Sequence, residues 1–232
     1  MSAGLRGHLA DAATLPRDYF WHRHRYRLAR QAVPRGARAV LDYGCGEGGF
    51  ARALADDGLR VWAYDEGDWA RRALASELES GRVRWLDHHA AAFDFVSALD
   101  VLEHADDAAL ARRLSALLRP GGTLCVTVPA DPALWSSWDE RLGHRRRYDA
   151  ASLRAVLEGA GLRVERVTAF FSYLVPAARR RVRASGGGVE FPRVGLGTNA
   201  ALRALGALER AYLRRADLSR GTSLLAVARR PS

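Results

Sequence analysis

A glycine-rich segment near the start of the chain has the residue types needed to hold a nucleoside-containing ligand. Gly44, Gly46 and Gly49 follow a short apolar run and precede an alanine- and leucine-rich stretch with a helical pattern. Glycines permit a tight turn and close approach of a ligand, and a helix N-terminus offers free N–H groups. Asp65, after the next apolar run, can accept hydrogen bonds from both hydroxyls of a ribose. These features fit NAD and S-adenosylmethionine equally well, so the loop alone leaves both cofactors open.

A second segment, residues 135–148, combines tryptophans with a run of arginines. Arginine forks suit carboxylate or phosphate groups, and tryptophan rings suit an apolar or sugar ring. The candidate substrate-binding residues in this segment are Trp135, Trp138, Arg145 and Tyr148. A structural alternative is that Arg146 and Arg147 pair with Asp139 and Glu140 and hold the loop in place. Both interpretations can hold for different arginines.

Alternating strand-like and helix-like stretches must position these residues. The alternation indicates βαβ units around a parallel sheet. Expected strands cover residues 39–42, 61–64, 83–86, 93–99, 123–128, 162–169 and 223–228. Expected helices cover residues 50–57, 69–78, 108–118, 151–161, 173–183 and 200–215. In an open sheet of this kind ligands bind beyond the carboxyl ends of the strands, where both segments described above would lie.

The composition is that of an ordinary globular domain. The chain has 232 residues, of which 48% are hydrophobic and 27% charged. Neither a membrane span nor a signal peptide is visible, and two lone cysteines make no disulfide framework, so we expect a cytoplasmic protein. The net charge of +10 comes entirely from arginine, since lysine is absent. Coding bias is the favoured explanation, and a basic face for an anionic partner is the alternative.

Four ordered segments resemble the motifs of class I S-adenosylmethionine-dependent methyltransferases. Residues 40–48 resemble the first motif, and Asp65 matches the ribose-binding acid. Residues 93–104, which end in Leu-Glu-His, resemble the fourth strand and the segment after it, as in the ubiquinone-pathway O-methyltransferases. Residues 118–124 resemble the turn into the fifth strand. The resemblance implies an α/β fold with a Rossmann-like, seven-stranded, mostly parallel sheet, an antiparallel last strand, helices on both faces and a helical insertion between the last two strands.

The resemblance also implies where S-adenosyl-L-methionine, and its product S-adenosyl-L-homocysteine, would bind. Gly44 and Gly46 would line the methionine part, and Asp42 would organise the loop amides from beneath. Asp65 would hold the ribose, with a helix N-cap as the alternative role. The other implied cofactor-binding residues are Cys45, which is otherwise a small filler, Glu66, Asp87 and His88 beside the adenine, and Leu99 and Asp100 facing the methionine ammonium group.

Two flanking segments resemble a bacterial subgroup of these enzymes. On a helix, Trp21 and Arg25 share one face, and their spacing resembles the subgroup's aromatic-x-x-x-Arg opening. Residues 143–148 resemble its Gly-His-x-Arg-Arg-Tyr run. The first helix would then be a lid, with Trp21 and Arg25 at the cofactor and Arg25 paired with the methionine carboxylate. A solvated, arginine-rich helix is the alternative.

We therefore expect transfer of a methyl group to a small-molecule, sugar or lipid-linked acceptor, at oxygen, by in-line displacement. His104 and His144 are the candidate general bases, although a lone histidine is more often structural. No metal constellation accompanies them in the sequence, so no metal dependence is expected. The single expected domain, residues 1–232, divides into a lid region (1–35), a cofactor-binding half (36–130) and a substrate-side half (131–232) with a helical insertion at 171–221.

Other functions and partners stay open. A methyltransferase acting on nucleic acid fits the charge, but no appended RNA-binding module and no Asn-Pro-Pro-Tyr-like base-flipping motif is visible. A NAD-dependent oxidoreductase and a cofactor-binding scaffold are further alternatives. Residues 170–183 run from apolar to basic, which fits either peripheral contact with anionic lipid or a cap over the site. The oligomeric state is not predicted.

Overall fold

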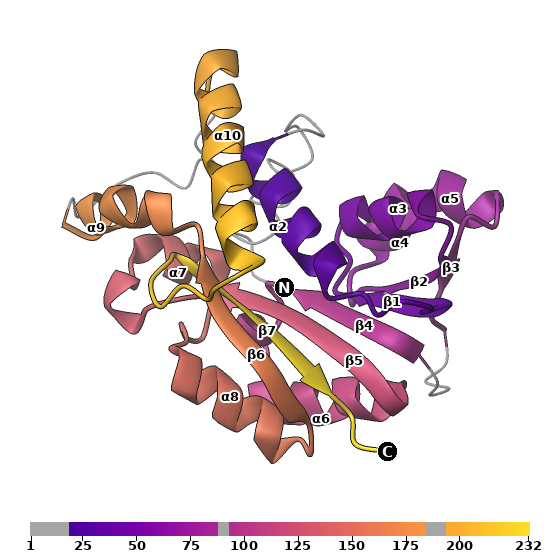
Figure 1. Cartoon of the computed structure of the whole chain (residues 1–232). Helices are drawn as coiled ribbons and strands as arrows, with labels where there is room; N and C mark the ends of the chain where they lie inside the picture. Colours follow the sequence, from indigo (N-terminus) through magenta and orange to yellow (C-terminus); the bar gives the residue numbers. More distant parts are fainter. Residues whose placement is uncertain (1–18, 88–92, 184–193) are drawn as a thin grey trace.

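The computed structural model describes residues 19–87, 93–183 and 194–232. A seven-stranded sheet in the order β3-β2-β1-β4-β5-β7-β6 forms its centre (Figure 1). The strands are β1 (Ala39–Tyr43), β2 (Arg60–Tyr64), β3 (Val83–Trp85), β4 (Phe93–Leu99), β5 (Leu118–Pro129), β6 (Arg163–Phe170) and β7 (Ser223–Arg229). The pairs from β3 to β5 are parallel, whereas β7 runs antiparallel to both β5 and β6. The predicted Rossmann-like sheet with an antiparallel last strand is confirmed.

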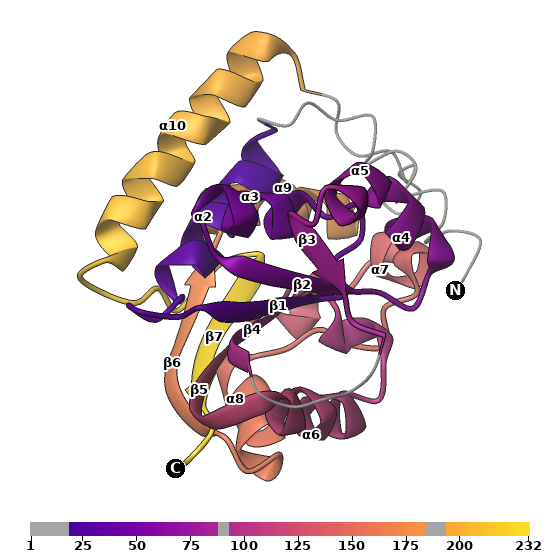
Figure 2. The same ribbon diagram turned by 90° about the vertical axis from the view of Figure 1, so that its right-hand side faces the viewer.

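Helices cover both faces of the sheet. The α-helices are α2 (Phe20–Gln31), α3 (Gly49–Asp56), α4 (Asp68–Ala73), α5 (Ala75–Glu79), α6 (Asp107–Leu117), α7 (Ser137–Leu142), α8 (Ala150–Gly159), α9 (Val175–Arg183) and α10 (Leu196–Leu213). Figures 1 and 2 show α2, α3 and α10 on one face, and α6 and α8 on the other.

One expected helix is interrupted. The helix expected over residues 69–78 divides into α4 and α5 at Leu74, whose backbone leaves the helical region. The Leu74 side chain is fully buried against the glycine loop, where a Cβ on Gly48 would lie 2.3 Å from Leu74 Cδ2. This packing contact, which local helix propensity does not reveal, determines the break.

The core consists of two clusters, one on each face of the sheet. Successive side chains of a strand point to opposite faces. Val40 of β1 therefore packs in one cluster with Phe50 and Leu54 of α3, and Leu41 packs in the other with Leu114 of α6. Strands that are buried on both faces have continuous apolar runs in their sequence, and these runs predict their positions. This double-sided core holds the carboxyl ends of β1, β2 and β4 rigidly beside one another.

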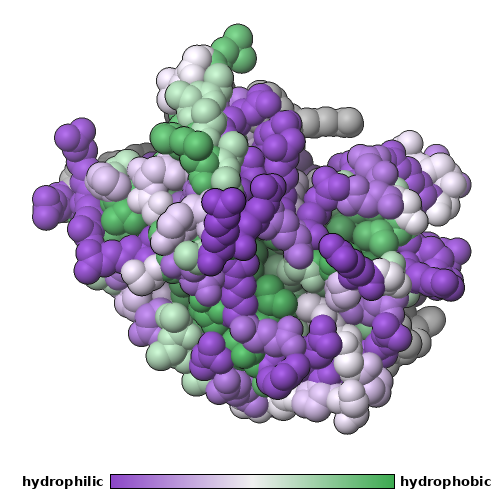
Figure 3. Space-filling model, viewed as in Figure 1, coloured by the Kyte–Doolittle hydropathy of each residue, from purple (hydrophilic) through white to green (hydrophobic). Residues whose placement is uncertain are grey.

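The insertion between β6 and β7 contains α9 and α10. Leu205, Leu208 and Tyr212 are exposed on α10, and Figure 3 shows hydrophobic atoms at the surface along this helix. Among the described helices, none is both long enough and apolar enough to cross a bilayer. Contact with a lipid surface stays a prediction, as do the single-domain organisation and the cytoplasmic location. The sequence also predicts a flexible loop over the glycine-rich residues 184–188, which lie outside the described residues.

Candidate active site

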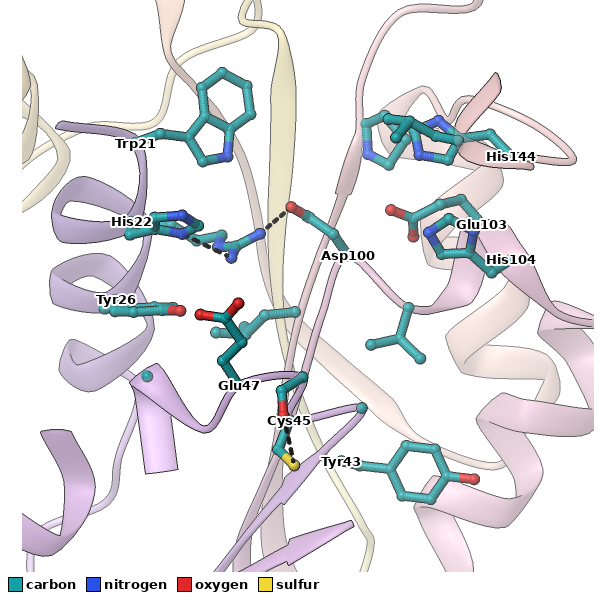
Figure 4. A pocket seen from close by; sticks show the side chains of 18 of the residues that line it. Trp21, His22, Tyr26, Tyr43, Cys45, Glu47, Asp100, Glu103, His104 and His144 are labelled. Carbon is teal, nitrogen blue, oxygen red and sulfur yellow. Dashed lines mark hydrogen bonds and ion pairs between the residues drawn. The ribbon is translucent and has the colours of Figure 1, made fainter. Parts of the chain in front are cut away.

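A cleft of about 1750 Å³ opens at the carboxyl ends of the parallel strands. The glycine loop between β1 and α3 forms its floor, α2 forms one wall, and the segments after β4 and α7 form the opposite wall (Figure 4). This is the position at which ligands bind in open α/β sheets. The cleft brings together residues from distant parts of the chain.

The glycine loop is held in shape by β2 and by the segment after it. The amides of Gly44 and Cys45 donate to the carbonyl oxygen of Tyr64, at 2.7 and 3.0 Å. Gly44 has φ of 70°, and a Cβ there would lie 2.5 Å from a methyl carbon of Val101. Glycine is therefore required at this position for both its conformation and its size. Gly44, Cys45 and Gly46 all border the cleft, as the resemblance implied.

Asp42 supports the loop from beneath and does not border the cleft. Its carboxylate is buried and accepts a hydrogen bond from Ser97 Oγ at 2.9 Å. Burial raises the pKa of the Asp42 carboxyl to about 7, although the Ser97 hydroxyl opposes the shift. The role expected for Asp42, beneath the loop, fits this position. Direct contact of Asp42 with a cofactor does not.

Asp65 and Glu66 follow β2 and border the cleft. Asp65 accepts one hydrogen bond from the amide of Gly46 at 3.0 Å and another from the amide of Gly67 at 2.9 Å. Its carboxylate therefore ties the glycine loop to the start of α4. Each carboxylate oxygen keeps a further lone pair, so the predicted hydrogen bonds to a ribose are compatible with this geometry.

The residues expected at the adenine are placed differently. Asp87 is exposed, pairs with Arg71 at 3.1 Å and does not border the cleft. Its observed partner is an arginine on α4, so the structure does not place Asp87 at the expected adenine position. His88 lies outside the described residues.

The helix α2 is joined to the end of β4 across the cleft. Arg25 forms an ion pair with Asp100, which also accepts a hydrogen bond from Thr127 Oγ1 at 2.7 Å. Burial alone would raise the pKa of the Asp100 carboxyl, but Arg25 and Thr127 hold it below its usual range. Asp100 has φ of 59°, a conformation that residues other than glycine seldom adopt outside functional sites. Leu99 and Trp21 also border the cleft, and Trp21 stacks on Phe171.

A polar cluster faces α2 from the opposite wall. It consists of Glu103 and His104, just after β4, and His144, just after α7 (Figure 4). The imidazole rings of the two histidines are 4.9 Å apart, and His144 Nδ1 lies 2.8 Å from Asp139 Oδ1. Burial lowers the pKa of His104 to about 4, and burial raises the pKa of Glu103 well above its usual range. The structure therefore brings both candidate bases together and adds Glu103, to which the sequence assigned no role.

The expected substrate-binding residues divide into two pairs. Trp138 and Arg145 border the cleft. Trp135 and Tyr148 do not; Trp135 Nε1 donates to Glu140, and Tyr148 is fully buried with its hydroxyl donating to Asp107 at 2.9 Å. Placing Tyr148 at the substrate is wrong, because its ring fills the core beneath the loop.

The arginines of this loop were expected to pair with Asp139 and Glu140. Arg147 does pair with Asp139, at 2.8 Å, as expected. Arg146 pairs with Asp107 at the start of α6 instead, so that part of the expectation is wrong. The loop is thus fastened to α6 as well as to itself.

The cleft also shows what the sequence did not reveal. Glu103, Asp139 and Tyr26 are buried or partly buried beside ionisable groups, and that environment is created by segments distant in the chain. Three potential metal ligands, Glu103, His104 and His144, have atoms within 4.8 Å of one another. The expectation that no metal constellation accompanies the histidines does not hold for this geometry.

Comparisons with known proteins agree with this architecture. Residues 17–167 match the family described as "Methyltransferase domain". A protein of Mycolicibacterium smegmatis named as a probable S-adenosylmethionine-dependent methyltransferase is 34% identical over 156 residues, which cover 64% of this chain and 61% of that protein. A ubiquinone biosynthesis O-methyltransferase of Xanthomonas campestris is 39% identical over 123 residues, covering 48% and 51%. The chain thus spans between half and about three fifths of these relatives.

Solved structures share the fold. The methyltransferase in complex with the Trm112 activator from Haloferax volcanii has a TM-score of 0.66 at 20% identity, over 98% of this chain and 95% of that one. Phosphoethanolamine N-methyltransferase 2 of Haemonchus contortus, in complex with S-adenosyl-L-methionine, has a TM-score of 0.60 at 18% identity, over 91% and 53%.

The fold and the family match together define the class of protein: the chain belongs to the methyltransferase-domain family. Its sheet is of the Rossmann-like type that the solved methyltransferase structures share. The family match favours a methyl donor over NAD as the ligand of the glycine loop. Membership of the bacterial subgroup stays a prediction.

Asp65→Ala is expected to weaken binding of S-adenosylhomocysteine. The loss should be about 1–3 kcal/mol, the range for a charged hydrogen bond. Isothermal titration calorimetry measures the affinity, and thermal melting reports whether the loop has loosened. Asp87→Ala is the matched control, because that exposed carboxylate lies away from the cleft. An Asp65→Ala protein that binds as tightly as the wild type would remove Asp65 from the cofactor site.

Proposed function

We propose that this domain transfers the methyl group of S-adenosylmethionine to a hydroxyl group of a small-molecule, sugar or lipid-linked acceptor. The observation that carries the proposal is the position of the Glu103, His104 and His144 cluster, in the same cleft as the glycine loop. The sulfonium is already an activated donor, so the protein must align the acceptor and remove its proton. Ring nitrogens and carboxylate oxygens facing the cleft are suited to that task.

In this proposal the methyl donor and the acceptor occupy different parts of the cleft. The donor would lie over Gly44 and Gly46 with its ribose at Asp65, and α2 would cover it through Trp21 and Arg25. The acceptor would enter between α2 and the polar cluster. Arg25 already forms an ion pair with Asp100. The carboxylate of the methionine part can therefore pair with Arg25 only by sharing the guanidinium with Asp100 or by displacing Asp100 from it.

The nature of the acceptor is supported by the outer part of the cleft. Trp138 and Arg145 border it, and the Arg181 guanidinium of α9 lies over the Trp138 ring, 5.0 Å from its centre. An aromatic face beside two arginines suits a ring that carries an acidic group. The similarity to an enzyme named as an O-methyltransferase agrees with transfer to oxygen.

Two measurements test this function. S-adenosylhomocysteine should raise the melting temperature of the protein, whereas NAD should leave it unchanged, because only the former matches the donor. Cofactor turnover should then be screened over phenols, sugars and hydroxy acids, each paired with its O-methylated counterpart as the blocked control. Turnover of the blocked compounds at equal rate would contradict transfer to a hydroxyl group. Stabilisation by NAD alone would contradict the donor as well.

A further inference from the structure

The cluster of Glu103, His104 and His144 has an arrangement that acid–base chemistry alone does not require. Its three potential ligand atoms lie within 4.8 Å of one another, and all three residues border the cleft. Glu103 and His104 come from the segment after β4, and His144 from the loop after α7. Figure 4 shows them grouped on the wall that faces α2.

The hydrogen bonds of the two histidines determine which ring nitrogens are free. His144 Nδ1 lies 2.8 Å from Asp139 Oδ1, and Asp139 is 0% exposed. The Asp139 carboxylate also accepts from Arg147 Nε at 2.8 Å and from the amide of Ser136 at 3.0 Å, so it is an acceptor toward His144 as well. His144 Nδ1 therefore carries the hydrogen, and Nε2 presents a lone pair. His104 is similarly hydrogen-bonded to the backbone of Gly143, which leaves its other nitrogen available.

This carboxylate–histidine pairing is the arrangement that orients histidine ligands of metal ions in proteins. Asp139 is itself held by Arg147, at 2.8 Å, and by the amide of Ser136, at 3.0 Å. The His144 ring is thus oriented from behind by a buried, fully engaged carboxylate. Its free nitrogen is the one that remains for a ligand.

Glu103 supplies the second observation. Its side chain is 0% exposed, and neither carboxylate oxygen has a hydrogen-bond partner within the described part of the chain. Buried polar groups are nearly always hydrogen-bonded, and an unpaired buried carboxyl is costly. The two arginines that act on it electrostatically are already engaged, Arg25 by Asp100 and Arg147 by Asp139. A bound cation would satisfy the Glu103 carboxylate.

We propose that Glu103, His104 and His144 bind a divalent transition-metal ion of the zinc, cobalt or manganese class. Two imidazole nitrogens and one carboxylate oxygen are the ligand set of an open site, in which another position is left for an exchangeable group. Around a tetrahedral ion with bonds of about 2.1 Å the ligand atoms lie roughly 3.4 Å apart, so these side chains draw closer on binding. The metal site stands on geometry alone. Its use rests on the proposed function: the open position would hold the acceptor oxygen and favour its deprotonation.

The test uses the full chain after treatment with a chelator. Titration with Co²⁺ should produce the visible absorption bands of a low-coordinate site at one equivalent, and Zn²⁺ should displace the cobalt. Asp139→Asn should weaken binding by about 10–100-fold, as expected for a residue that orients a ligand, and Glu103→Gln and His144→Gln should weaken it further. His22→Ala is the matched control, because His22 borders the same cleft on α2 outside the cluster. That variant should bind Co²⁺ as the wild type does.

The possible outcomes separate the two proposals. Absence of the cobalt spectrum from the wild type, or ligand variants that bind cobalt normally, would overturn the metal site. So would loss of binding in His22→Ala, since the ion would then lie elsewhere. S-adenosylhomocysteine affinity is measured on the same samples, with melting temperature as the check on folding. If the protein binds S-adenosylhomocysteine but no metal, the metal site is contradicted and the proposed function stands. If it binds metal but no S-adenosylhomocysteine, the proposed function is contradicted and only the metal site stands.

Discussion

His104→Ala is expected to lower kcat for methyl transfer by about 10²–10⁴-fold, the range for a group that assists proton transfer. The reason is the position of His104 in the cluster with Glu103 and His144, where the proposed function assigns its free ring nitrogen to the proton of the acceptor. The cofactor loop does not depend on this ring. Binding of S-adenosylhomocysteine should therefore be unchanged, so the loss should appear in kcat at saturating donor.

Initial-rate kinetics with varied donor and acceptor separate kcat from KM. The melting temperature serves as the control for folding, since His104 is partly buried. A variant that loses cofactor affinity and kcat together would indicate general damage to the cleft. A variant with unchanged kcat would show that alignment alone supports catalysis, and the role of the cluster would have to be abandoned.

Glu209→Ala is expected to lower the free energy of unfolding by about 1–3 kcal/mol, the cost of leaving buried hydrogen-bond donors without their acceptor. Glu209 of α10 is buried and accepts hydrogen bonds from His24 Nε2 at 2.7 Å and from the amides of Phe171 and Ser172, both at 2.8 Å. One carboxylate thus joins α2, the end of β6 and α10. Its removal leaves several buried donors without an acceptor.

The protonation of this network follows from its partners. Arg210 can only donate, and it lies 2.7 Å from His24 Nδ1, so that nitrogen accepts and Nε2 carries the hydrogen donated to Glu209. Burial lowers the pKa of His24, which fits a neutral ring. Burial would raise the pKa of Glu209, but His24, Ser172 and Phe171 hold it below its usual value. The stability that Glu209 contributes is therefore present above its unfolded-state pKa and is lost as the pH falls through its folded-state pKa.

Urea unfolding of the wild type and of Glu209→Ala measures the difference. The difference in the free energy of unfolding between the two proteins should be largest at neutral pH and should decrease on acidification. Glu158→Ala is the matched control, because its exposed pair with Arg154 should contribute about 0–1 kcal/mol. Equal destabilisation by the two variants, or a gap that widens in acid, would contradict the assigned network.

Local features allowed much of the fold to be predicted from the sequence. Apolar runs such as that of β4 are continuous because parallel strands are buried on both faces, so periodicity and turn residues locate them. The glycine loop is equally visible, because its closely spaced glycines lie directly between an apolar run and a helical pattern, although Tyr64 and Val101 hold it in shape. The helix at 69–78 is the exception, because its break at Leu74 depends on packing against the loop.

What the sequence by itself determined about this protein is the order of the strands and helices along the chain and the position of the glycine loop and Asp65 beside the cleft. Both depend on residues close together in the chain. Only the tertiary structure decided which side chains are buried and which groups pair. Tyr148 is in the core, Arg146 pairs with Asp107, and Asp87 pairs with Arg71 at the surface. The grouping of Glu103 with His144 likewise depends on segments that are distant in the chain and meet only on folding, where burial and the loss of water select each partner.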